Sequence, residues 1–192
     1  MTADPPVRVL VLEGSLNSSL TIVRSLGRMG ADITVGDHRR FGPASLSRYV
    51  KRTVRYPNPE DSCDTFIEFL KTHISNNSYD LVLPVSDFTV VPIAERRTDL
   101  EPYSRLGIAS DEQIRLAGDK AETVKIARAC GVPCPETFIP QSIDDVRHAA
   151  SEIPYPAIIK PRSKVAWIDG VPVVHKVTAR NYVSSPEALL AR

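Results

Sequence analysis

Two lysines stand where a positive charge can contact a phosphate group. Lys120 follows Gly118 and Asp119 and opens a predicted helix, whereas Lys160 ends an apolar strand predicted over residues 157–161. The ammonium group of a lysine beside an apolar surface acts on a polyphosphate as a flexible point charge. Each lysine alone has a simpler explanation, because lysines commonly end surface elements. A phosphate-binding role for the pair therefore depends on whether the predicted helices and strands would bring the two lysines together.

Other chemical motifs are incomplete or missing. The turn over residues 13–19 can present backbone amides to an anion, and Asp37 ends a strand where dinucleotide folds place a ribose-binding acid. Only Gly14 of the fingerprint G-x-G-x-x-G is there, so we favour an unliganded turn over a nicotinamide cofactor. The sequence has no P-loop, no HExxH and no nucleophile elbow. We predict no metal ligand, because the histidines have no metal-ligand spacing: His38, His73, His148 and His175.

One segment is strongly basic. It could bind phosphate groups, but acidic residues from Glu60 onward balance it and residues 41–43 interrupt it, so we favour a solvated surface. Its members are His38, Arg39, Arg40, Arg48, Lys51, Arg52 and Arg55.

The first part of the chain predicts a parallel sheet with helices on both faces. Short apolar runs bounded by glycine, proline and polar residues are typical of buried parallel strands. We expect strands at residues 7–12, 33–35, 51–56, 81–85 and 106–109. A helix ending at Gly30 joins the first two, so that they form a βαβ unit. Asp61 and Ser62 can cap a second helix, and Asp87 a third that runs to about Arg97. The apolar face of the second is Phe66, Ile67, Phe69, Leu70 and Ile74.

The second part predicts an α+β unit with antiparallel pairing. We expect helices at residues 111–116, from Lys120 to a stop at Gly131, and from a Ser142 cap to about residue 151. Strands are expected at residues 137–139, 157–161, 171–177 and 180–183. In the helix after Lys120, the side chains expected to face a core are Val124, Ile126, Ala127 and Ala129.

The end of the sequence predicts a piece of a longer protein. Ser185 and Pro186 form a helix start, with a serine cap and proline at the first helical position. The helix has only about six residues before Arg192 and no stop motif. The alternative is a short terminal helix.

The order of these segments resembles the start of an ATP-grasp domain. The resemblance rests on Asp119-Lys120, a helix, residues 131–137 (GVPCPET), another helix, and residues 155–161 (YPAIIKP). The preceding sheet resembles the pre-ATP-grasp domain, and residues 83–87 (LPVSD) resemble its fourth strand in carboxylate–amine ligases. The chain is similar over nearly its whole length to the group of carbamoyl phosphate synthase large chains and biotin carboxylases.

This resemblance implies a fold and a set of site residues. The fold is α/β, with an open parallel Rossmann-like pre-ATP-grasp sheet in residues 1–108 and a small, truncated α+β ATP-grasp lobe in residues 109–192. Lys120 and Lys160 would contact the phosphates of ATP, and Ile158 would line the adenine pocket. The cofactors would be ATP and Mg²⁺, with the magnesium ligands in a C-terminal part that follows residue 192.

The resemblance also implies an activity. A complete enzyme would be an ATP-dependent ligase that activates a carboxylate as an acylphosphate for attack by an amine or similar nucleophile. Its partners would be small-molecule carboxylate and amine substrates. The chain by itself would be inactive, and a homodimer is compatible with the sequence.

One departure from the family pattern keeps two alternatives open. The family has a glycine-rich flap after the second lysine, but residues 161–170 hold one glycine and read as a hairpin arm turning at Asp169-Gly170. Arg162, Ser163 and Lys164 could still cover phosphates. The first alternative is a degenerate, non-catalytic regulatory or scaffold module, and the second is a Rossmann-type dinucleotide-binding protein.

Composition excludes several other classes. The 192 residues are 42% hydrophobic and 24% charged, as in ordinary globular proteins. A net charge of +1 argues against a dedicated nucleic-acid binder. The N-terminus does not read as a signal peptide, and no apolar run approaches the roughly 20 residues that cross a bilayer. The three cysteines form no CxxC, which favours a reduced, cytoplasmic protein: Cys63, Cys130 and Cys134.

Overall fold

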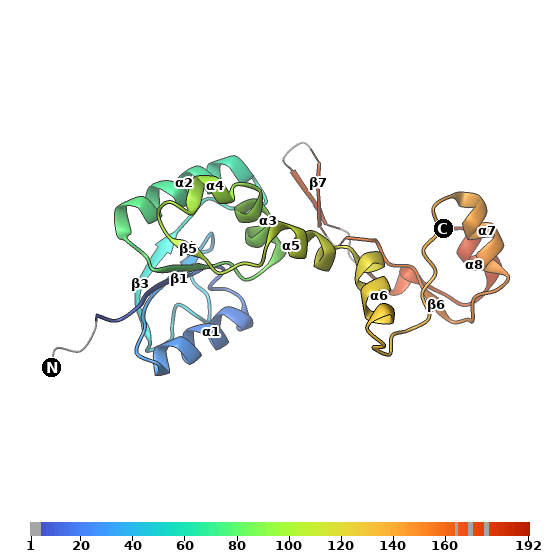
Figure 1. Ribbon diagram of the computed structural model, residues 1–192, viewed down its shortest axis with the longest axis horizontal. Coiled ribbons are helices and arrows are strands. Elements are labelled where there is room, and N and C mark those ends of the chain that lie inside the picture. Colours follow the sequence, from blue (N-terminus) through green and yellow to red (C-terminus); the bar gives the residue numbers. More distant parts are fainter. Residues whose placement is uncertain (1–4, 164, 169–170, 175–176) are drawn as a thin grey trace. The chain divides into compact units, whose positions relative to one another are not determined.

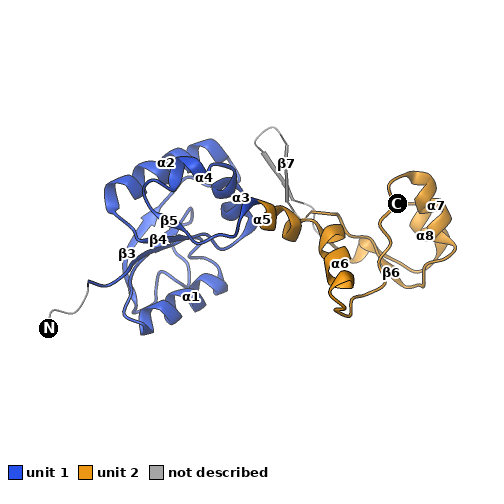
Figure 2. Ribbon diagram, viewed as in Figure 1, with its two compact units in different colours: residues 1–111, 167–172 blue, residues 112–166, 173–192 orange. Residues whose placement is uncertain are grey.

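The chain forms two compact units. The computed structural model describes residues 5–163, 165–168, 171–174 and 177–192. Unit 1 comprises Met1–Asp111 with Trp167–Pro172, and unit 2 comprises Glu112–Ala166 with Val173–Arg192 (Figure 2). The domain boundary near residue 108 stays a prediction, because a compact unit need not be a domain that folds alone.

Unit 1 contains a five-stranded parallel sheet in the order β3-β2-β1-β4-β5, which confirms the predicted fold class. Helix α1 covers one face, and α2, α3 and α4 cover the other (Figure 1). The strands are β1 (Arg8–Val11), β2 (Asp32–Asp37), β3 (Val50–Arg55), β4 (Leu81–Leu83) and β5 (Arg105–Leu106). The helices are α1 (Asn17–Arg28), α2 (Cys63–Asn77), α3 (Asp87–Glu95) and α4 (Arg97–Leu100).

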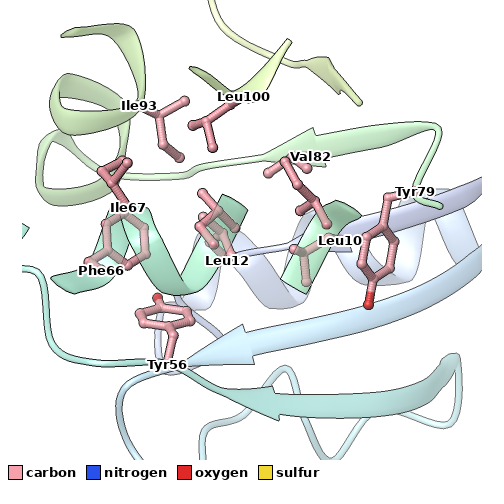
Figure 3. Close-up of a cluster of buried hydrophobic side chains, with 11 residues drawn as sticks. Leu10, Leu12, Tyr56, Phe66, Ile67, Tyr79, Val82, Ile93 and Leu100 are labelled. Carbon is pink, nitrogen blue, oxygen red and sulfur yellow. The ribbon is translucent and has the colours of Figure 1, made fainter. Parts of the chain in front are cut away.

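Strand β1 separates two hydrophobic cores. Successive side chains of a strand point to opposite faces, so Val9 and Val11 pack towards α1 while Leu10 and Leu12 pack towards α2. All four are at most 1% exposed. Figure 3 shows Leu10 and Leu12 in the second core, with Phe66 of α2. Burial on both faces explains why β1 is a continuous apolar run rather than an alternating one.

The helix ends in unit 1 follow the sequence with one correction. Helix α2 begins after Ser62, whose Oγ accepts the N–H of Thr65, as predicted. Helix α3 begins after Ser86 and not after Asp87, because Ser86 has extended backbone and its Oγ accepts the N–H of Phe88 at 3.3 Å. Asp87 stands in the first turn instead, where a carboxylate interacts favourably with the helix dipole.

Unit 2 has the expected α+β character. Strands β6 and β9 pair antiparallel, which confirms the predicted pairing mode. Helix α7 begins with a capping box between Ser142 and Asp145. The elements that belong wholly or mostly to this unit are α5 (Asp111–Gly118), α6 (Lys120–Ala129), α7 (Ile143–Ala150), β6 (Ala157–Ile158), η1 (Ala179–Asn181), β9 (Tyr182–Val183) and α8 (Pro186–Leu190).

Strands β7 (Val165–Ile168) and β8 (Val171–Val174) form a two-stranded sheet. The hairpin turn predicted at Asp169-Gly170 lies outside the described residues.

Three predictions for unit 2 are wrong in detail. Residues 137–139 form no strand, because the prolines that flank them at 135 and 140 lack the N–H that a ladder requires. Residues 180–181 belong to the 3-10 helix η1 rather than to β9. In α6, Ile126 is 45% exposed and Ala129 is exposed, while Ala121 is buried. The other two predicted side chains, Val124 and Ala127, are half-buried on the same side of α6 as Ala121, so that half of the prediction holds.

Two phenylalanines of unit 1 test the assignment of the core. Phe66 is fully buried, whereas Phe41 is 69% exposed. We expect Phe66→Ala to lower the free energy of unfolding by roughly 3–5 kcal/mol through lost burial and a cavity. The matched variant Phe41→Ala should change it by less than about 0.5 kcal/mol. Urea unfolding followed by circular dichroism measures both, and equal losses would contradict this packing.

Candidate functional site

Lys120 is positioned by the capping of helix α6. Asp119 has extended backbone, and its Oδ1 accepts the N–H groups of Ala121 at 2.8 Å and Glu122 at 3.3 Å. An aspartate at this position satisfies N–H groups that have no partner within the helix. The dipeptide Asp119-Lys120 therefore fixes where α6 starts and sets Lys120 as its first residue.

The start of α6 is fastened to Arg162, 42 residues further along the chain. The N–H of Lys120 donates to the carbonyl of Arg162 at 2.9 Å, and Lys120 Nζ lies 3.5 Å from the same oxygen. The guanidinium of Arg162 donates through Nε to Asp119 Oδ1 at 3.3 Å and through Nη2 to Oδ2 at 2.5 Å. One carboxylate thus caps the helix and holds the segment after Lys160.

The contacts of Asp119 have an electrostatic consequence. Hydrogen bonds from the Arg162 guanidinium, and then from the amides of Glu122 and Ala121, hold the pKa of the Asp119 carboxyl below its ordinary value. These donors favour the charged form because each one binds the carboxylate more strongly than the neutral acid.

Ile158 and Lys160 are positioned by the β6–β9 ladder. Ile158 lies in β6 opposite Tyr182, and the N–H of Ile159 extends the ladder by donating to the carbonyl of Asn181 at 2.8 Å. Ile158 is half-buried and Lys160 is exposed. Lys160 stands two residues before Arg162, so the chain keeps its backbone within about 7 Å of the residue fastened to α6. Among the described residues, the ammonium of Lys160 has no carboxylate partner within 4 Å.

The structure thus brings the start of α6 and the segment after β6 together, and these are the segments that carry Lys120 and Lys160. The roles of Lys120, Lys160 and Ile158 towards a nucleotide stay predictions. Sequence reasoning named Arg162 only as part of a flap. An aspartate directly before a helix signals a cap, but no local pattern announces a contact between residues 119 and 162.

In unit 1, the turn after β1 makes hydrogen bonds and close contacts with other segments of the same unit. Asp37 Oδ2 accepts the N–H of Ser15 at 2.6 Å, and Oδ1 accepts the N–H of Arg39 at 2.7 Å. The carbonyl of Gly14 accepts the N–H of Ala44 at 3.0 Å, so the loop after β2 lies against this turn. A Cβ on Gly14 would meet Val35 at 2.4 Å, which explains the glycine by packing. These contacts favour the unliganded turn over a dinucleotide site.

Glu13 joins this turn to the one after β4. Its buried carboxylate accepts the N–H of Ser86 at 2.6 Å, the N–H of Val85 at 3.2 Å and the hydroxyl of Thr89 at 2.8 Å, and the hydroxyl of Ser86 also donates to it. Residues 83–87, which resemble a family strand, are therefore fixed in place by a residue that the sequence did not single out.

The described residues contain neither a metal-binding cluster nor a membrane-spanning helix. No three or more His, Cys, Asp or Glu side chains among them gather as a metal ion would require. None of the helices in the described ranges has the length and apolar character needed to span a bilayer.

No protein-family model and no curated protein matches the chain. Solved structures do match. The biotin carboxylase domain of 2-oxoglutarate carboxylase from Hydrogenobacter thermophilus, solved with MgADP, ADP and bicarbonate, has a TM-score of 0.62 at 18% identity, over 96% of this chain and 39% of that chain. L-amino acid ligase from Bacillus licheniformis has a TM-score of 0.62 at 16% identity, over 98% and 42%. N5-carboxyaminoimidazole synthetase from Staphylococcus aureus, complexed with ADP, has 0.58 at 14% identity, over 88% and 41%.

These likenesses establish the fold. The chain has the fold of part of the ATP-grasp enzymes, as its sequence resemblance predicted. It spans about two fifths of the length of these three structures.

The pKa of Asp119 tests the contact with Arg162. We expect Arg162→Ala to raise this pKa towards the ordinary range, because the guanidinium is the main cause of its depression. At pH values above the ordinary pKa of an aspartate, the Asp119–Arg162 pair contributes fully to the stability of the fold. This contribution is lost as the pH falls through the lowered pKa of Asp119. Carboxyl ¹³C shifts followed against pH by NMR measure the value.

Asp145 is the matched control. It also caps a helix, but its lowered pKa comes mainly from the N–H of Gln141 and from Ser142. Arg162→Ala should leave the pKa of Asp145 unchanged. A variant in which Asp119 keeps its lowered pKa, or in which both values move together, would show that Arg162 does not hold Asp119 in solution.

Proposed function

We propose that this chain is the N-terminal part of an ATP-dependent ligase of the ATP-grasp superfamily. The complete enzyme activates a carboxylate as an acylphosphate, which an amine or similar nucleophile then attacks. The observation that carries the proposal is the fastening of Lys120 to Arg162, because it brings the helix that starts with one lysine to the segment that follows the other. In this proposal residues 1–108 are the pre-ATP-grasp domain and residues 109–192 a lobe of the ATP-grasp domain.

The proposed roles follow from charge and polarity. Lys120 and Lys160 neutralise the ATP phosphates, and two flexible ammonium groups can do so without a fixed geometry. Ile158 offers a half-buried apolar side chain to the adenine. Magnesium would neutralise phosphate charge further. The described residues contain no cluster of acidic or histidine side chains that fits the ion, so its ligands would come from elsewhere in the protein.

The proposed partners are small molecules. The bicarbonate bound to one similar structure and the amino acid ligase activity named for another support a carboxylate and an amine as substrates. The first of these structures is a domain dimer, which supports a homodimer. We place the protein in the cytoplasm, where its unpaired cysteines would stay reduced.

One observation favours a second function. The ammonium of Lys120 already contacts the carbonyl of Arg162, and the guanidinium of Arg162 is held by Asp119. A segment tied down in this way, and poor in glycine, is suited to a degenerate module that binds or signals without catalysis. Release of ADP by the full-length protein, dependent on an added carboxylate, separates the two functions. No turnover across a broad panel of carboxylates and amines would favour the degenerate module.

Lys160 is the residue whose removal tests ATP binding. We expect Lys160→Ala in the full-length protein to weaken ATP binding roughly ten- to a hundredfold, because a charged hydrogen-bond partner of the phosphates is lost. Isothermal titration calorimetry measures the dissociation constant. The control is Lys125→Ala, since Lys125 is a lysine of the same unit that is neutralised by Glu122 at 2.7 Å. Unchanged ATP affinity of Lys160→Ala, or equal losses in both variants, would refute the assignment.

A further inference from the structure

A hollow of about 400 Å³ on unit 1 has three arginines in its lining and contains none of the residues of the proposed ATP site. Two of them, Arg24 and Arg28, lie on α1. The third, Arg48, comes from the loop that precedes β3. The remaining lining residues are Leu46, Ser47 and Tyr49.

The loop is fixed against α1 by a glycine. A Cβ on Gly27 would lie 2.4 Å from the side chain of Tyr49, so the missing side chain lets this tyrosine rest on the helix. Ala44, at the other end of the loop segment, is fully buried in the core beside α1. The N–H of Val50 donates to the carbonyl of Ser47 at 3.0 Å. The hollow is therefore preformed between a helix and an anchored loop.

The charged side chains that line the hollow are all arginines. Arg24 and Arg28 are exposed and separated by four residues on one helix, an arrangement of like charges that destabilises a helix. There is no aspartate or glutamate in residues 14–31 or 38–59. Of the acids between these segments, Asp32 pairs with Arg52 at 2.6 Å and Asp37 accepts backbone N–H groups of its own region.

Only part of this charge has a structural explanation. Arg28 is in the last turn of α1, where a cation interacts favourably with the helix dipole. Arg48 donates to the hydroxyl of Tyr49 at 2.9 Å, and its guanidinium lies 4.9 Å from the centre of that ring. This hydrogen bond lowers the pKa of the Tyr49 phenol, and Arg28 contributes in the same direction. Arg24 has no carboxylate partner among the described residues. An anion in the hollow would relieve the repulsion.

We infer that this hollow binds a small anion that carries one or two phosphate groups, held by Arg24, Arg28 and Arg48. The planar guanidinium matches the geometry of phosphate oxygens and can donate two parallel hydrogen bonds. The hydroxyl of Ser47 adds a further donor at the wall. The volume of the hollow lies within the range of about 300–1,000 Å³ typical of small-molecule sites. The net charge of +1 favours a small ligand over a nucleic acid.

The inference is independent of the proposed ATP site, because its residues belong to unit 1 and Lys120 and Lys160 belong to unit 2. Titration of the ¹⁵N-labelled protein with inorganic pyrophosphate, and in parallel with inorganic phosphate, tests it by NMR. We expect saturable shifts of the backbone amides of Arg24, Arg28 and Arg48. Shifts at unit 2 report on the other site, so either proposal can fail alone.

Variants separate a built site from a general attraction for anions. Arg28→Ala and Arg48→Ala should each weaken pyrophosphate binding roughly tenfold or more, because each loses a charge-assisted contact. Arg48→Lys keeps the positive charge but loses the planar guanidinium and its parallel donors. It should weaken pyrophosphate binding by less than Arg48→Ala does. The control Lys51→Ala removes a positive charge three residues from Arg48 that does not line the hollow, and should change affinity less than about twofold.

Three results would overturn the inference. They are shifts in unit 1 that do not saturate, an equal loss of affinity in Lys51→Ala and Arg48→Ala, and tighter binding of a single-stranded RNA that depends on the same arginines. The substituted side chains are exposed, so we expect all variants to melt within a few degrees of the parent protein. A variant that melts far lower would be replaced by Arg24→Ala, which leaves the contacts of Arg48 and Tyr49 intact.

Discussion

The candidate phosphate site depends on the carboxylate of Asp119. A helix start leaves backbone N–H groups without partners, and Asp119 satisfies those of Ala121 and Glu122 while it binds the guanidinium of Arg162. Removing this one group would take away both the helix cap and the guanidinium contact, while the hydrogen bond from the N–H of Lys120 to the carbonyl of Arg162 would remain. A residue that need not touch a ligand thus helps to join the two segments that carry the candidate lysines. Because Asp119 directly precedes Lys120, the sequence itself indicates that Lys120 begins the helix that Asp119 caps.

Glu13 solves a similar problem in unit 1 by a different means. A charge buried without a partner is strongly unfavourable, yet no cation pairs with Glu13 among the described residues. Its carboxylate is instead surrounded by the hydrogen-bond donors of residues 85, 86 and 89. Because those donors belong to the turn after β4 and to α3, the acid joins the ends of the two neighbouring strands β1 and β4. Asp37 does the same for the turn after β1 and the loop after β2. The positions at which dinucleotide folds contact a ligand are therefore occupied by internal hydrogen bonds.

The sequence predicted the strands and helices that depend on interactions between residues close together in the chain. Periodicity and caps located β1, α2 and α7, since apolar spacing and a serine cap act within a few residues. It predicted Lys120 and Lys160 as candidates from their neighbours along the chain. It could not predict Arg162 as the partner of Asp119, or Glu13 as the partner of Ser86, because these contacts join residues 43 and 73 positions apart. The strand predicted at residues 137–139 fails for a local reason, because prolines at 135 and 140 flank its β-favouring side chains.

The basic segment illustrates why charge along a sequence is a poor guide to charge in space. Its members separate in the fold: Arg52 pairs with Asp32, and Arg55 donates to the carbonyl of His38 at 3.1 Å. Arg48 lies apart from these other basic residues and lines a hollow with Arg24 and Arg28, which are 20 or more residues away in the chain. All three side chains are exposed, as the predicted solvated surface requires, but only Arg48 lines the hollow. The concentration of positive charge arises from helix spacing and from the glycine that lets Tyr49 approach α1, and neither is visible in a count of basic residues.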